Sequence, residues 1–115
     1  MDHVCAVFPI LSGKTDAARA FQRELVGKRM ADYDRSERRI GITEEHWFIA
    51  SVPGGDQFVV YIESQDFGKA LGQFSASRDE FDMWFKQQVQ ETTGVDFNNL
   101  PPDMTLPELV SSYEA

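Results

Sequence analysis

The sequence predicts a single α+β domain with an antiparallel sheet, and three observations support this prediction. The chain has 115 residues, a length that suits one domain with one hydrophobic core. Hydrophobic residues make up 42% of the chain and charged residues 26%, which is the balance of a folded globular domain. Strand-like and helix-like segments alternate along the chain, and a Gly-Gly turn joins two of the strand-like segments.

The first third of the chain is predicted to form a strand and a helix. Residues 4–11 are a nearly continuous apolar run, Val-Cys-Ala-Val-Phe-Pro-Ile-Leu, which favours a strand buried on both faces. Thr15 is suited to cap a helix that continues to about Ser36. The apolar residues of this segment fall on one side up to Gly27, so that side is expected to face the core.

A β-hairpin is the strongest local prediction. Residues 42–52 and 57–63 are rich in β-branched and aromatic residues, and Pro-Gly-Gly-Asp separates them. Two glycines supply the positive φ angles that a tight hairpin turn needs, so Gly54 and Gly55 are predicted as its central residues.

Two helices and a loop-rich tail are predicted after the hairpin. Asp66 begins a short helix, and Ser77 with the glutamate three residues later forms a capping box for a second helix that ends at Gly94. Residues 95–115 are rich in Pro, Asn and Asp and are expected to be mostly loop, with a candidate last strand at residues 108–113. This order is the ferredoxin-like split-βαβ plan with one extra helix.

Counting outward from the turn gives the sheet two different faces. One face is apolar and suits packing against the helices; it bears Trp47, Ile49, Phe58, Val60 and Ile62. The other face mixes aromatic and titratable residues; it bears Glu44, His46, Phe48, Ala50, Tyr61 and Glu63. Because helices on one side leave this second face bare, a second copy of the chain is expected to cover it as a homodimer.

His46 opposite Glu63 is the predicted catalytic pair. Imidazole titrates near neutral pH, and an adjacent carboxylate fixes its tautomer and raises its basicity. Phe48, Tyr61 and Glu44 are the predicted ligand-binding residues around this pair. The same residues also fit a non-enzymatic ligand-binding or regulatory module, or a purely structural dimer interface. Two glutamates and one histidine at this spacing are common by chance, so no metal is predicted.

Charge and cysteine content argue against several classes of protein. The net charge of −8 disfavours DNA or RNA as a partner. The basic residues between Lys28 and Arg39 are interpreted as a solvated helix end rather than an anion-binding patch. Cys5 is the only cysteine, which excludes an internal disulfide and a Cys-rich zinc site. Without a membrane-length apolar run or a signal-peptide pattern, a cytoplasmic protein is expected.

Three short motifs add a resemblance to a known family. They are Glu-Glu-His-Trp-Phe at residues 44–48, Phe-Asp-Met-Trp-Phe at 81–85 and Thr-Gly-Val-Asp at 93–96. With the element order, they resemble an uncharacterised family of small bacterial proteins in the dimeric α/β-barrel superfamily, which includes the antibiotic-biosynthesis-monooxygenase-like proteins. The resemblance implies a homodimer whose sheets face each other, with a cavity between each sheet and its helices or across the barrel.

The resemblance also implies a ligand class. The expected ligand is a hydrophobic or aromatic small molecule, and the expected activity, if any, is a monooxygenase-like oxidation without a cofactor. His46 would draw a proton from a phenol-like substrate, and Glu63 would orient it. The superfamily's haem-degrading members use a pocket Asn, Trp and His, but Trp47 follows His46 directly and so points to the opposite face. His3 is set aside because it lies close to the terminus.

Overall fold

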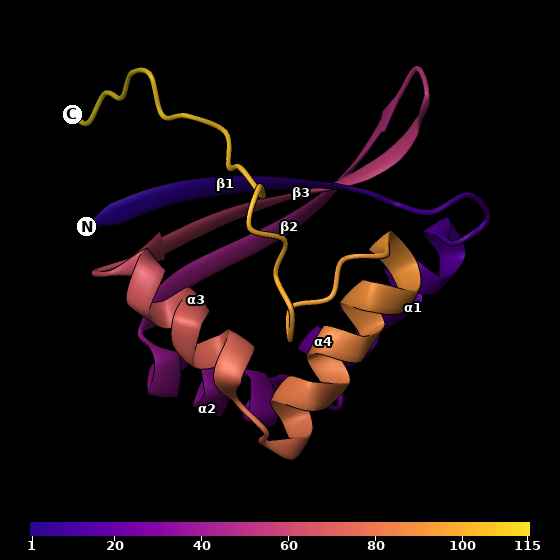
Figure 1. Ribbon diagram of the computed structural model, residues 1–115, viewed down its shortest axis with the longest axis horizontal. Helices are drawn as coiled ribbons and strands as arrows, with labels where there is room; N and C mark the ends of the chain where they lie inside the picture. Colours follow the sequence, from indigo (N-terminus) through magenta and orange to yellow (C-terminus); the bar gives the residue numbers. More distant parts are fainter.

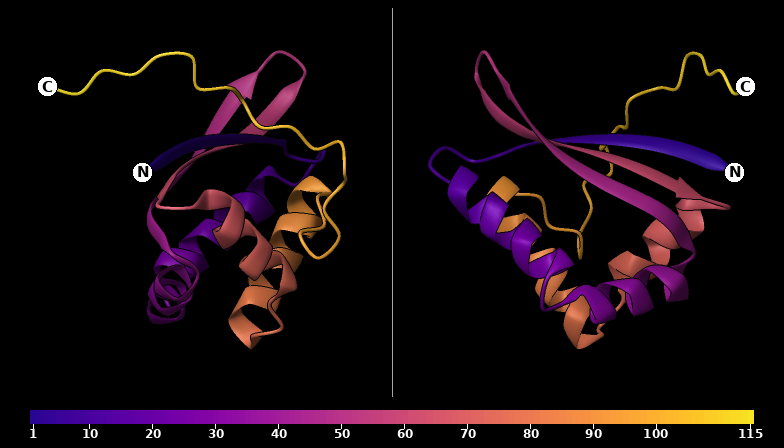
Figure 2. Two further views of the ribbon diagram at one scale, coloured as in Figure 1. Left: turned by 60° about the vertical axis from the view of Figure 1, so that its left-hand side comes forward. Right: turned by 180° about the vertical axis from the view of Figure 1, so that it is seen from behind.

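The computed structural model describes residues 1–115 as a three-stranded sheet with helices on one side (Figure 1). The elements are β1 (Asp2–Pro9), α1 (Thr15–Val26), α2 (Met30–Ile40), β2 (Ile42–Val52), β3 (Gly55–Ser64), α3 (Phe67–Ala76) and α4 (Glu80–Thr93). The sheet is antiparallel with strand order β1-β3-β2. Figure 2 shows the four helices gathered below the same face of the sheet. The predicted α+β class is confirmed.

The core lies between this covered face and the helices. Its centre is aromatic: the ring of Phe21 on α1 meets the rings of Trp47, Phe58, Trp84 and Phe85 edge-on, with centroids 5.3–6.5 Å apart. Edge-to-face contacts of this kind stabilise a core beyond the burial of the rings themselves. None of the helices has the length and apolar content that a membrane crossing requires.

The single helix predicted for residues 15–36 is wrong, because the segment forms two helices, α1 and α2. The break falls at Gly27, where a Cβ atom would lie 2.6 Å from the carbonyl oxygen of Arg23. Only glycine fits this close approach. The second helix then continues to Ile40 and ends at Gly41, whose φ of +90° is the left-handed conformation of a helix C-cap.

The predicted hairpin register is wrong by two residues. The turn centres on Pro53 and Gly54, since Val52 pairs with Gly55 across it. Proline pre-sets the φ of the first central position, and Gly54 supplies the positive φ of the second, +102°. A displacement of two residues changes the cross-strand partner of each residue but leaves every side chain on its predicted face of the sheet. The two predicted faces are therefore retained.

Strand β1 has one buried and one exposed face. Ala6 and Phe8 are buried against the helices, whereas Val7 is 41% exposed on the other side. The prediction that this strand is buried on both faces is therefore wrong for a single copy of the chain.

The helices after the hairpin begin and end close to their predicted positions. Asp66 caps α3, as predicted, by accepting a hydrogen bond from a backbone N–H in the first turn. The cap of α4 is Asp79, however, and not Ser77, which is the C-terminal cap of α3. Gly94 ends α4 as predicted, with a φ of +82°.

The tail forms no helix or strand, so the candidate last strand at residues 108–113 is not formed. The side chains of Met104 and Leu106 instead reach the space between the sheet and the helices. The tail then runs beside β1 back toward the N-terminus (Figure 1), where Oε1 of Glu114 lies 3.8 Å from Nε2 of His3.

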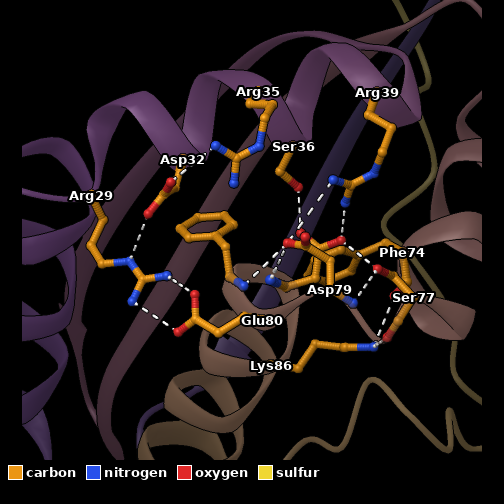
Figure 3. Close-up of polar contacts among 12 residues, drawn as sticks. Arg29, Asp32, Arg35, Ser36, Arg39, Phe74, Ser77, Asp79, Glu80 and Lys86 are labelled. Carbon is orange, nitrogen blue, oxygen red and sulfur yellow. Dashed lines mark hydrogen bonds and ion pairs between the residues drawn. The ribbon is translucent and has the colours of Figure 1, made fainter.

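A buried polar network holds α2 against α4. The carboxylate of Asp82 is fully buried and accepts hydrogen bonds from Ser36 at 2.5 Å, from Ser77 at 2.6 Å and from the guanidinium of Arg39. Figure 3 shows Ser36 and Arg39 reaching down from α2 to this network. Because a buried carboxylate is tolerated only when it is paired, these contacts fix the position of α2 over the sheet.

Lys86 holds the end of α3 in the same region. Its side chain is almost fully buried, and Nζ donates to the backbone carbonyls of Phe74, Ser75 and Ser77 at 2.8–3.2 Å. The Phe74 carbonyl also accepts from the backbone N–H of Ser77, whereas the carbonyls of Ser75 and Ser77 lie beyond this last backbone hydrogen bond of α3. The ammonium therefore replaces the water that would otherwise satisfy them.

Candidate active site between the sheet and the helices

An apolar cavity of about 70 Å³ lies between the covered face of the sheet and the helices. A single water needs only about 10–15 Å³, so the cavity is several times larger than that. Fifteen of its 17 lining residues are hydrophobic. Its aromatic lining is formed by Phe8, Trp47, Phe67, Phe74, Phe85 and Phe97. An apolar and aromatic lining with a few polar groups is typical of a small-molecule site.

The polar groups of the lining are two carboxyl groups, Glu37 from α2 and Glu45 from β2. Oε2 of Glu45 accepts a hydrogen bond from Nε1 of Trp47 at 2.9 Å and another from the hydroxyl of Tyr33. Oε2 of Glu37 is buried and has no hydrogen-bond partner. The cavity therefore has one carboxyl group that is held in place by donors and one with an unpartnered oxygen atom.

Burial controls the protonation of this pair. It raises the pKa of Glu37 far above the ordinary carboxyl range, and the charge of Glu45 raises it further. Burial also raises the pKa of the Tyr33 phenol, again helped by the charge of Glu45. Glu37 and Tyr33 therefore keep their protons at neutral pH. A protonated acid beside a hydrogen-bond-accepting carboxylate is an arrangement suited to general acid–base chemistry.

The helix and strand periods account for the position of these residues, although none of them was among the predicted site residues. Tyr33, Glu37 and Ile40 are spaced i, i+4, i+7, so they share the side of α2 that faces the sheet. Glu45 lies two residues before Trp47 and so shares its face of β2. The sequence feature that identifies such residues is a glutamate at a helix or strand position whose periodicity places it among buried residues.

A polar groove of about 540 Å³ lies outside the same carboxyl pair, between α2 and the start of β2. It shares Glu37, Ile42 and Glu45 with the cavity. These three residues therefore form the wall between the interior and the solvent. On another side, the tail residues Met104 and Leu106 line the cavity.

The predicted site residues lie on the other, bare face of the sheet. They are Glu44, His46 and Phe48 on β2, and Tyr61 and Glu63 on β3. None of them lines the apolar cavity, and Glu44 alone borders the outer groove. The structure brings Glu44, His46, Tyr61 and Glu63 into one cluster with His3 from β1, whereas Phe48 shares the face but lies opposite Val59.

The predicted pairing of His46 with Glu63 is wrong because of the turn. His46 lies opposite Tyr61, with the two rings stacked at 6.4 Å, and its Nε2 lies 3.5 Å from Oε2 of Glu44. Glu63 instead lies opposite both Glu44 and His3. Nδ1 of His3 is 2.9 Å from the hydroxyl of Tyr61 and 3.9 Å from Oε1 of Glu63. Tyr61 is thus flanked by two imidazoles.

The two carboxyl groups of the bare face also interact. A hydrogen bond between them raises the pKa of Glu44 and lowers that of Glu63. The pair therefore takes up its first proton on Glu44. The structure contains no group of three or more His, Cys, Asp or Glu side chains arranged to hold a metal ion.

The basic residues on and before α2 are paired with carboxylates. The pairs are Lys28 with Glu24, Arg29 with Glu80 and Asp32, Arg35 with Asp32, Arg38 with Asp34, and Arg39 with Asp82. Figure 3 shows Arg29 reaching Glu80 on α4. The guanidinium of Arg29 also lies over the rings of Phe81 and Trp84. Arg29 and Arg39 reach α4, whereas Lys28, Arg35 and Arg38 pair with carboxylates three or four residues away. This pairing argues against an anion-binding patch.

Comparison with known proteins reveals a similar fold. No protein-family model matches the sequence, and no match is found among curated proteins. A solved structure with a similar fold is tetracenomycin F2 cyclase from Streptomyces glaucescens, a type-II polyketide cyclase. The TM-score is 0.59 and the sequence identity is 15%, over 100% of this chain and 99% of that chain. The similarity concerns the fold alone.

Proposed function

We propose that this protein binds a hydrophobic or aromatic small molecule in the cavity between sheet and helices, and transfers protons on it with Glu45 and Glu37. The observation that carries the proposal is the placement of two carboxyl groups, one of them with an unpartnered oxygen, in an otherwise apolar cavity. Polar and ionisable groups are costly in such a position, so this pair of carboxyl groups is more consistent with chemistry than with packing.

The reaction class that fits this pair is an intramolecular condensation between a carbon acid and a carbonyl group. Glu45 accepts a proton from the carbon beside one carbonyl, and that carbon forms a bond to a second carbonyl carbon. The second carbonyl oxygen takes the proton of Glu37 as it becomes a hydroxyl. The proton on Glu45 then passes to Glu37, which restores the pair without an oxidant. A similar fold in a type-II polyketide cyclase supports this choice.

The monooxygenase-like oxidation implied by the family resemblance is the alternative chemistry. It begins with the same removal of a proton but then consumes O2 as the oxidant. Oxygen uptake during turnover therefore separates the two reactions. The carboxyl pair itself accounts for proton transfer and supplies no argument for the oxygen step.

Proton abstraction can be tested without the natural substrate. Acetophenone is an aromatic ketone of simple structure, and its methyl protons exchange with D2O when a base removes them. We expect the protein to accelerate this exchange above the buffer rate, as measured by NMR, and Glu45→Gln to remove the acceleration. The matched control is Glu63→Gln on the bare face, which should exchange at the wild-type rate. An exchange rate equal to that of buffer, or one unaffected by Glu45→Gln, would contradict the proposal.

The bare face is a second candidate site, and we propose that two copies of the chain pair through it. Val7 is 41% and Phe48 is 58% exposed there, beside Cys5 and the cluster around Tyr61. Pairing would cover these apolar groups and bury the other face of β1, as its continuous apolar sequence favours. Glu44, His46, Phe48, Tyr61 and Glu63 would then lie at the interface.

Ultracentrifugation tests this pairing directly. We expect a dimer at micromolar concentration and a folded monomer after Phe48→Glu, which places a charge on the proposed interface. A wild-type monomer would rule the pairing out. If His46→Ala abolished turnover while leaving the dimer intact, the catalytic role first predicted for His46 would be restored.

A further inference from the structure

We infer that the ligand of the apolar cavity is an uncharged molecule with a phenol- or enol-type hydroxyl group, and that this hydroxyl donates a hydrogen bond to Oε2 of Glu37. The inference rests on the proposed function, since it takes the cavity as the binding site, and it adds the chemical class of the ligand. Glu37 then becomes the residue that determines specificity.

The charge of the lining excludes an anionic ligand. The 17 lining residues include two glutamates and no lysine, arginine or histidine. A carboxylate or phosphate would therefore lose its hydration without gaining a counter-ion and would lie close to Glu45. The outer groove adds Asp34 and Glu44 near the same end, and its only cation, Arg38, is paired with Asp34.

The hydrogen-bonding pattern calls for a ligand that donates. The hydroxyl of Tyr33 and Nε1 of Trp47 already donate to Glu45, so they are engaged within the protein. The polar atom left over is Oε2 of Glu37, which is buried without a partner. When Oε1 carries the proton of Glu37, Oε2 is a carbonyl-type acceptor. A ligand with only an ether or ester oxygen would leave this atom unsatisfied, whereas a hydroxyl group would satisfy it.

The position of Glu37 orients the ligand. Glu37 lies in the wall shared with the outer groove, whereas the aromatic lining from α3 and α4 borders the cavity and not the groove. The hydroxyl end of the ligand is therefore directed toward the α2–β2 side. Its apolar body is directed toward Phe74 and Met104. A hydroxylated aromatic ring has this division into one polar edge and one apolar body.

A matched set of probes tests the inference on the full chain. The probes are 4-methylphenol, toluene, 4-methylbenzoate and 4-methylbenzylamine, which share a ring and differ in the polar group. We expect calorimetric titration at pH 7 to give about tenfold tighter binding of 4-methylphenol than of toluene. The benzoate should show no binding, and the amine should bind more weakly than the phenol because its ammonium group loses more hydration in an apolar cavity.

Two variants assign the preference to Glu37. Glu37→Leu removes the acceptor and should make 4-methylphenol and toluene bind equally. Glu37→Gln keeps a carbonyl oxygen at the same place and should retain the preference. Glu91→Gln, on the exposed side of α4, is the control and should match the wild type. If Glu37→Leu failed to fold, the ratio of 4-methylphenol to toluene affinity, measured in the wild type and in Glu37→Gln, would still test whether the ligand donates to residue 37.

The outcomes separate the inference from the proposed function. Equal binding of toluene and 4-methylphenol to the wild type would overturn the role of Glu37 while leaving the cavity as a binding site. Tighter binding of the benzoate or of the amine would overturn the ligand class in the same way. If no probe bound and acetophenone exchange were also absent, the proposed function itself would fail.

Discussion

A pair of glutamates lies on each side of the sheet: Glu37 of α2 with Glu45 of β2 on the covered side, and Glu44 of β2 with Glu63 of β3 on the bare side. The comparison between the two pairs shows how the surroundings decide what a carboxyl group does. On the covered face, burial raises the pKa of Glu37, and Glu45 is held by donors from Tyr33 and Trp47. On the bare face, Glu44 and Glu63 influence each other mainly through a hydrogen bond in contact with water. Solvent screens the second pair, so strong acid–base effects are expected only on the covered face.

The largest expected effect is on proton transfer. Glu45→Gln keeps the size of the side chain but removes the base, and we expect it to slow acetophenone exchange about 100-fold or more relative to wild type. His46→Ala and Glu63→Gln should change the rate less than about twofold, because neither residue reaches the cavity. A loss of exchange in the His46 variant but not in the Glu45 variant would place the base on the bare face and contradict the assignment to the covered face.

A large effect on stability is expected from the network that positions α2. Asp82→Ala removes the carboxylate that pairs with Arg39, Ser36 and Ser77, and we expect it to lower the free energy of unfolding by about 2–4 kcal/mol. Because α2 carries Glu37, weaker probe binding in the cavity should accompany this loss. Urea unfolding measures the stability, and Arg35→Ala on the exposed side of α2 is the control. Equal stabilities of Asp82→Ala and wild type would contradict the role given to this network.

A moderate effect is expected in the pH dependence of stability. Between the ordinary pKa of a glutamate and the raised pKa of Glu37, the folded protein keeps a proton that the unfolded chain has released. Stability should therefore fall as pH rises through this window, by at most about 1.4 kcal/mol per pH unit for this one group. Glu37→Gln should flatten this part of the curve of urea midpoint against pH and raise stability at pH 8. A Glu37→Gln curve parallel to the wild type would show that Glu37 ionises normally.

The smallest expected effect on folding comes from the bare face. His46→Ala removes an exposed side chain, so the free energy of unfolding of a single copy should change by less than about 0.5 kcal/mol. If two copies pair through this face, the same variant should weaken the dimer measurably in ultracentrifugation while the fold is kept. A large loss of stability in the monomer would show that the cluster around Tyr61 contributes to folding.

The fold could be predicted from the sequence where local chemistry decides it. Alternation placed Trp47 and Phe58 on the covered face, and the capping residue Asp66 marked the start of α3. The break at Gly27 was missed because it depends on how closely the chain approaches a carbonyl one turn earlier. The register was missed because proline followed by glycine competed with Gly-Gly for the centre of the same turn.

The candidate site was harder to predict, because it depends on contacts between distant residues. Glu37 and Glu45 come from different elements, and only the packing of α2 over the sheet brings them to one cavity. Their periodicity was visible in the sequence, but a conspicuous histidine drew the prediction to His46 on the other face. The contact of His3 with Tyr61 depends on the pairing of β1 with β3, which no local sequence pattern specifies.

The location of a bound probe tests the central claim most directly. In a complex with 4-methylphenol, NMR measures which protein protons lie within a few ångströms of the ring. Binding between the layers predicts contacts from the probe to Trp47 and Phe74 and a shifted Trp47 Nε1–H signal. Contacts to His46 and Tyr61 instead would place the ligand on the bare face and contradict the assignment of the site to the covered one.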